Sequence, residues 1–178
     1  MGNWQKAIAF FDEIGFSLDN KEFEDKLIAQ KTICLLELKN LGFDYIFNLY
    51  VRGPYSPVFT TDYYQHGDEF KNNDTPLTLS EDEIATVTYL DKLFEKSPSL
   101  LEIGATYGFL LKEGGMSAVD AYNIVKQEKG FYQDSLIAKG VSKAKQFLFE
   151  PTSDDLEWLK NEVRPWQEAA IASMRHHG

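Results

Sequence analysis

The sequence predicts a mainly α-helical (α+β) fold, a compact helical domain with one small β-hairpin or two short strands. Apolar residues recur at helical spacing over most of the chain. One segment, residues 43–52, changes to an alternating pattern of apolar and more polar residues, which is typical of a half-buried strand. The chain therefore offers many helical faces and very little strand.

The first two helices are predicted from their apolar faces and their closing residues. The face of the first helix consists of Trp4, Ala7, Ile8, Phe11 and Ile14. The face of the second consists of Leu27, Cys34, Leu35, Leu38 and Leu41. Gly15 and Gly42 follow these faces, at the position where a left-handed residue closes a helix.

The predicted strand ends at Gly53-Pro54, where the chain turns a corner into a third helix. Ser56 is placed to cap this helix, with Pro57 at its first position and its end near His66. Residues 68–76 are polar and predict a loop. Residues 77–79 are a candidate partner for the first strand.

The second half of the chain reads as successive capped helices. Their starts are predicted at Ser80, Ser97, Ser117 and Ser153. Ser80 forms a capping box with Glu83. A further apolar face consists of Ile137, Val141, Ala144 and Leu148. We therefore predict a helical domain over residues 1–150 and a helical extension over residues 151–178, divided near Pro151.

Composition narrows the possible classes of function. The chain has 28 acidic and 18 basic residues and a formal net charge of −10. No apolar run approaches the ~20 residues of a membrane-spanning helix, and the N-terminus enters an amphipathic pattern, so we expect a cytoplasmic protein with no membrane partner. Cys34 is the single cysteine, which excludes an internal disulfide and a cysteine-rich zinc site.

Metal and catalytic chemistry have little support in the sequence. The histidines are His66, His176 and His177, and a terminal pair supplies no fixed geometry, so we predict no metal site and no cofactor. A carboxylate pair formed by Asp62 and Glu69 stays open, and with it an enzyme of unrecognised class. Gly104 and Gly108 lie in a helical pattern, where they favour close helix packing over phosphate binding.

A nucleic-acid site is a further alternative, because small helical proteins with one hairpin are often winged helices. The candidate patch consists of Lys126, Lys129, Lys139, Lys143 and Lys145. Glu128 and Asp134 oppose it locally, and the net charge repels a phosphate backbone. We therefore expect no nucleic-acid partner and keep a winged-helix-type DNA-binding regulator as the alternative.

The strongest candidate site is the corner after the predicted strand, together with two polar residues of the second helix. These residues are either a partner-binding surface or a purely structural motif that holds the corner to the helix. The corner contains Tyr50, Arg52, Gly53, Pro54, Tyr55 and Ser56. Gln30 and Lys31 lie on or beside the apolar face of the helix, where a polar group needs a partner. We expect Gln30 to hydrogen-bond the backbone near Gly53-Pro54, and Lys31 to reach a carboxylate or the carbonyl groups of that turn.

These residues also resemble a known family. Lys26-Leu27 and Gln30-Lys31 open a leucine-rich helix, and the strand ends in the sequence YVRGPYSP at residues 50–57. This combination is similar to the Panacea (SocA-like antitoxin) domain, and more closely to bacterial and archaeal relatives with a similar QK helix and GPYS corner. The resemblance spans residues 22–148, with further matches at 101–106, 125–126 and 136–148. The antitoxin form usually has a shorter Gly-Pro-Val corner, and the tail after Pro151 has no counterpart.

The resemblance implies a mainly helical domain that binds and neutralises a toxin or presents it to a protease. We therefore expect a non-enzymatic protein-interaction module, antitoxin-like or adaptor-like, whose partner is a protein such as a toxin. The acidic overall charge favours a basic partner.

Overall fold

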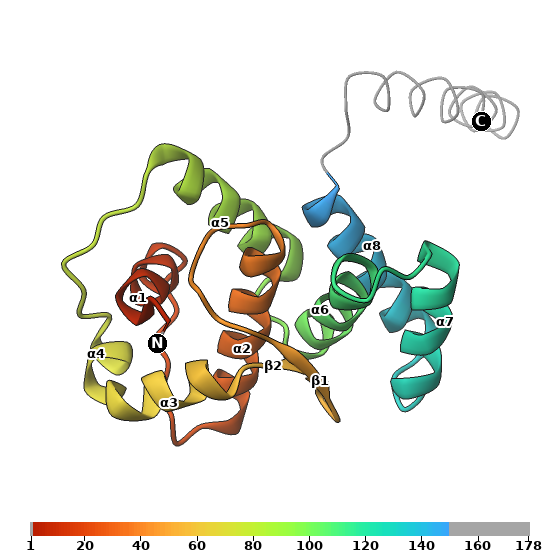
Figure 1. The fold of residues 1–178 in the computed structure, drawn as a ribbon, viewed down its shortest axis with the longest axis horizontal. Coiled ribbons are helices and arrows are strands. Elements are labelled where there is room, and N and C mark those ends of the chain that lie inside the picture. Colours follow the sequence, from red (N-terminus) through yellow and green to blue (C-terminus); the bar gives the residue numbers. More distant parts are fainter. Residues whose placement is uncertain (1, 150–178) are drawn as a thin grey trace, which may run out of the picture. The chain divides into compact units, whose positions relative to one another are not determined.

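The computed structural model describes residues 2–149, and the described residues up to Leu148 form one compact unit. In this part of the chain, eight α-helices and one two-stranded antiparallel sheet are present, which confirms the predicted fold class (Figure 1). The elements are α1 (Trp4–Glu13), α2 (Phe23–Leu38), β1 (Asn48–Tyr50), β2 (Gly53–Tyr55), α3 (Pro57–Gln65), α4 (Gly67–Asn72), α5 (Glu81–Phe94), α6 (Pro98–Lys112), α7 (Ala118–Glu128) and α8 (Asp134–Leu148).

Helix α2 is the centre of the core. Most of its residues are buried, including the polar Gln30, Lys31 and Thr32. It packs against α6, which in turn packs against α8. The close approach depends on the two glycines of α6: a methyl group on Gly104 would lie 2.6 Å from the Phe94 ring, and one on Gly108 would lie 2.6 Å from the Leu148 side chain. The predicted packing role of these glycines is confirmed.

The predicted helix starts are confirmed wherever the structure describes them. The side chains of Ser56, Ser80, Ser97 and Ser117 each accept a hydrogen bond from a backbone N–H of the helix that they precede. Ser80 and Glu83 form the complete capping box. The predicted helix after Pro151, with its cap at Ser153, lies outside the described residues.

The predicted long strand over residues 43–52 is wrong, because only Asn48–Tyr50 is a strand. Its partner is Gly53–Tyr55 and not residues 77–79, since the turn at Val51 and Arg52 brings the chain directly back. Burial alternates as expected from residue 43 to residue 47 but stops there. Leu49 is 44% exposed and Val51 is 93% exposed, because the hairpin extends beyond the core.

The predicted loop over residues 68–76 is also partly wrong, since Gly67–Asn72 forms the short helix α4. Its one buried residue, Phe70, packs against the rings of Phe11, Phe59 and Tyr63. The burial of Phe70 among these rings holds α4 against the core, although most of the other residues of α4 are polar. Among the described residues, no helix is both long enough and apolar enough to cross a membrane.

Candidate binding groove

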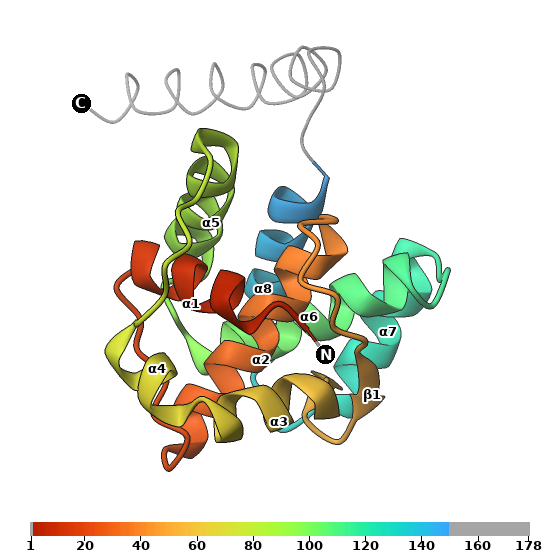
Figure 2. The same cartoon turned by 60° about the vertical axis from the view of Figure 1, so that its left-hand side comes forward.

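The hairpin formed by β1 and β2 lies between α3 and α7, as the turned view shows (Figure 2). Tyr50 pairs with Gly53, and Leu49 pairs with Pro54. Antiparallel strands alternate hydrogen-bonded and non-hydrogen-bonded pairs, and proline has no N–H to donate. The Leu49–Pro54 pair is therefore the non-hydrogen-bonded one, and the carbonyl group of Pro54 faces away from β1, where another donor can reach it.

Gln30 of α2 binds the backbone at the end of the hairpin. Its Oε1 accepts a hydrogen bond from the Ser56 N–H at 2.9 Å, and its Nε2 donates to the Ser56 carbonyl at 3.1 Å and to Thr60 Oγ1 at 2.9 Å. The predicted contact between Gln30 and the corner is confirmed, and it falls on Ser56.

Lys31 of α2 binds the carbonyl group that faces away from β1. Its Nζ donates to the Pro54 oxygen at 2.6 Å, and the side chain is only 2% exposed. The predicted reach of Lys31 to a carbonyl group of the turn is therefore confirmed. Burial lowers the pKa of Lys31 to about 8, against the favourable charge of Glu102, which lies across the site.

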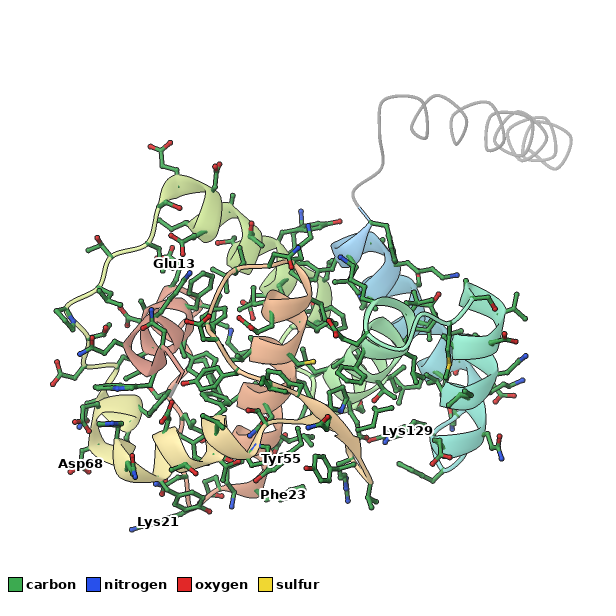
Figure 3. All side chains as sticks on the ribbon, viewed as in Figure 1. Glu13, Lys21, Phe23, Tyr55, Asp68 and Lys129 are labelled. Carbon is green, nitrogen blue, oxygen red and sulfur yellow. The ribbon has the colours of Figure 1, made fainter. Side chains whose placement is uncertain are left out.

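A second lysine holds the hairpin from its other side. Lys129, at the end of α7, donates from Nζ to the Val51 carbonyl at 3.0 Å and lies 3.7 Å from Glu102 Oε1 (Figure 3 labels Lys129). The hydroxyl group of Tyr132 donates to Glu102 Oε2 at 2.7 Å. Burial, together with this bond to a carboxylate, raises the pKa of Tyr132 to about 12.

These contacts hold the hairpin at both ends, and we call the set the hairpin latch. It consists of Gln30, Lys31, Glu102, Lys129 and Tyr132. Gly53 completes the fit: its φ of +89° suits glycine, and a methyl group there would lie 2.4 Å from Thr106 Oγ1. The hairpin is therefore fixed against α2 and α6 by charge, hydrogen bonds and close contact.

The predicted lysine patch for nucleic acid is wrong at Lys129, which is 2% exposed and paired with a buried carboxylate. Lys126 lies 4.0 Å from Asp134, and Lys145 lies over the Tyr107 ring. The remaining members, Lys139 and Lys143, are on α8. The five lysines therefore do not form one exposed surface, because Lys129 is buried.

Between the hairpin, α2 and α3 lies a cavity of about 420 Å³, which we call the hairpin groove. Helix α2 contributes Phe23, Lys26, Leu27, Gln30 and Lys31. The hairpin contributes Tyr50, Val51, Arg52, Gly53 and Tyr55, and α3 contributes Thr60, Tyr63 and Tyr64. Figure 3 labels Phe23 and Tyr55 on this side of the molecule. The size lies within the range of ligand pockets, about 300–1,000 Å³.

The edge of the groove carries large apolar side chains that remain in solvent. Phe23, Tyr50, Val51 and Tyr64 are all more than half exposed. Phe23 lies under the guanidinium group of Arg52, 5.4 Å from the ring centre, and the rings of Tyr50 and Tyr55 meet edge to face. Soluble proteins rarely expose several large apolar side chains next to one another, and such clusters mark interaction sites. The groove is therefore a candidate interaction surface.

Sequence reasoning found the hairpin side of this groove and Gln30 and Lys31 of α2, but it did not predict Phe23 or the wall formed by α3. Phe23, Lys26, Leu27, Gln30 and Lys31 recur at helical spacing, and this spacing was the available signal. The partners Glu102 and Lys129 carried no local signal, because a charged residue on or at the end of a helix is usually solvated. Tyr132 lies in the turn between α7 and α8, where its sequence neighbours give no sign of a buried carboxylate partner.

The other candidates of the sequence have structural roles. Cys34 is buried in the core, and burial raises the pKa of its thiol. Asp62 accepts a hydrogen bond from Tyr45 at 2.7 Å, while His66 stacks on Trp4 and lies 3.6 Å from Glu69. Asp62 and Glu69 thus have separate partners. Among the described residues, no group of three or more His, Cys, Asp or Glu is arranged to hold a metal ion.

Comparisons with models of known protein families, with curated proteins and with solved structures find no match. The resemblance to the Panacea domain therefore stays a prediction. The function of the groove and of the hairpin latch is therefore inferred from the residues that form them.

Proposed function

We propose that this chain is a non-enzymatic protein-interaction module, antitoxin-like or adaptor-like, and that it binds a partner protein through the hairpin groove. The observation that supports this most is the cluster of exposed aromatic and aliphatic side chains on a fixed hairpin. Tyrosine, phenylalanine and arginine are enriched in the cores of protein interfaces, and tyrosine and arginine are also enriched among the residues that contribute most of the binding energy. All three types meet at the edge of this groove.

The hairpin latch supports the same function. An isolated hairpin of three-residue strands is marginal in water, so it would have to be ordered by its partner at a cost in affinity. Here Lys31 and Lys129 hold two of its carbonyl groups from opposite sides. The exposed tip therefore presents Tyr50 and Val51 in one arrangement before a partner arrives.

The polar groups at the base of the groove also fit a binding role. Gln30 is engaged with Ser56, and Lys31 with Pro54, so both maintain the shape of the groove. The Panacea resemblance adds the class of partner, a toxic protein encoded next to this chain.

The experiment measures binding between the purified chain and the product of the neighbouring reading frame by isothermal titration calorimetry. Val51→Asp places a charge at the exposed tip and should weaken binding about tenfold or more. Val119→Asp is the matched control, since Val119 is 68% exposed on α7, outside the groove. Circular dichroism checks that both variants fold. Absence of binding, or equal affinity of the Val51→Asp variant and the wild type, would overturn the proposal.

A further inference from the structure

The charge of the hairpin groove is opposite to that of the whole chain. The chain carries a net charge of −10. Among the described residues that line the groove, three are cationic, Lys26, Lys31 and Arg52, and none is acidic. At physiological salt, charges more than about 8 Å apart in solvent are largely screened. A bound group therefore responds to these local cations and only weakly to the acidic surface elsewhere.

Aromatic rings, and not carboxylates, hold the two cations at the edge of the groove. The guanidinium group of Arg52 lies over Phe23, and Lys26 Nζ lies 3.3 Å from the hydroxyl oxygen of Tyr64 and over its ring. Within residues 2–149, neither cation forms an ion pair with a carboxylate, although the chain is rich in acidic residues. A guanidinium group stacked on a ring still offers its N–H donors in the plane of the group, in the geometry that matches a carboxylate.

The base of the groove also favours an anion. Within residues 2–149, Lys31 keeps its ammonium group buried with one hydrogen-bond partner, the Pro54 carbonyl, and with the charge of Glu102 across the site. An anion brought into the groove would lower the cost of that buried charge, since an opposite charge nearby favours the charged form. The cations at the edge and at the base of the groove therefore both favour an anionic ligand group.

We propose that the hairpin groove binds a short acidic segment of the partner protein, with a carboxylate on Arg52 and Lys26 and an aromatic or aliphatic side chain among the tyrosine rings. This inference rests on the proposed function and specifies its partner. It also differs from the expectation of a basic partner, which was drawn from net charge alone. A protein segment is favoured over a free small acid, because the exposed apolar side chains extend around the edge of the groove to the 93% exposed Val51.

The test is a selection of random-sequence peptides, displayed on yeast, against the full-length chain. Enriched peptides are synthesised, and their dissociation constants are measured by fluorescence polarisation. The double variant Lys26→Gln, Arg52→Gln removes both cations at the edge. The matched control, Lys92→Gln, Lys139→Gln, removes the same charge from exposed positions on α5 and α8, outside the groove.

We expect enriched peptides that combine Asp or Glu with an aromatic or aliphatic residue. The groove double variant should weaken them about tenfold or more, while the control should change their affinity by less than about twofold. Added salt should weaken wild-type binding toward the level of the groove variant.

The other outcomes separate the two proposals. Peptides that are neutral or basic, and that depend on Val51 but not on Lys26 and Arg52, would overturn the acidic segment and leave the proposed function standing. A selection that yields no peptide weakened by Val51→Asp would count against both. Displacement of the peptides by micromolar 3-phenylpropionate would identify a site for a free small acid and overturn the inference.

Discussion

Replacing Gln30 with methionine tests the contribution of the hairpin latch to stability, because it removes the acceptor of the buried Ser56 N–H. Methionine keeps the length and flexibility of the side chain and removes only the amide. The Ser56 carbonyl stays satisfied, because it also accepts hydrogen bonds from the Thr60 N–H at 3.1 Å and from Thr60 Oγ1 at 3.2 Å. The Ser56 N–H has no such substitute and would be left buried without an acceptor.

The size of the effect follows from these contacts. A buried donor left unsatisfied costs about 1–3 kcal/mol, and each neutral hydrogen bond contributes about 1 kcal/mol net. We therefore expect Gln30→Met to lower the free energy of unfolding by about 2–3 kcal/mol. For a chain of this size, that loss corresponds to a fall in Tm of roughly 5–10 °C.

Urea denaturation followed by circular dichroism measures the change. Gln127→Met is the matched control, because Gln127 is an exposed residue of α7, and we expect it to change stability by less than about 0.5 kcal/mol. If Gln30→Met and Gln127→Met have the same effect, Gln30 contributes nothing to the latch and the reasoning is wrong.

Three further predictions use the same denaturation assays or a simple chemical probe. Gly53→Ala should be more destabilising than Gly115→Ala by about 1–3 kcal/mol, because both residues have positive φ but only the first methyl group would meet Thr106; equal losses would contradict this. Burial lowers the pKa of Lys31 from 10.5 to about 8, so the folded chain releases this proton at a lower pH than the unfolded chain. Between neutral pH and a pH above 10.5, the free energy of unfolding of the wild type should therefore rise by about 3 kcal/mol relative to Lys31→Met, and parallel pH curves would refute the buried charge. Cys34 should react with a thiol reagent only after denaturation, and rapid reaction in the native chain would show that the core opens at α2.

Local chemistry explains which features the sequence could predict. A helix start needs only a serine and the backbone three residues later, so Ser56 and Ser80 were recognisable by themselves. Gln30 and Lys31 were recognisable because a polar group on a buried helical face requires a partner nearby. The aromatic corner, with its glycine and proline, offered backbone groups that could serve as these partners.

The features that the sequence did not predict depend on distant contacts. Lys129 looks like any lysine at the end of an amphipathic helix, and its acceptor, Val51, is 78 residues away. Helix α4 exists because Phe70 finds a cluster of rings assembled from α1 and α3. The sequence did not predict β2, because Pro54 argues against a strand. Proline is tolerated at this position because Pro54 belongs to the non-hydrogen-bonded pair with Leu49, where no N–H donor is needed.

The long separation between Val51 and Lys129 also matters while the chain is being synthesised. A ribosome adds about 5–20 residues per second, so the 78 residues between the hairpin tip and its lysine take roughly 4–16 s to appear. During this interval, α2 can already hold Pro54, but the tip lacks its second support. The finished groove is therefore a late product of translation, and a nascent chain cannot present Tyr50 and Val51 in their final arrangement until α7 has emerged.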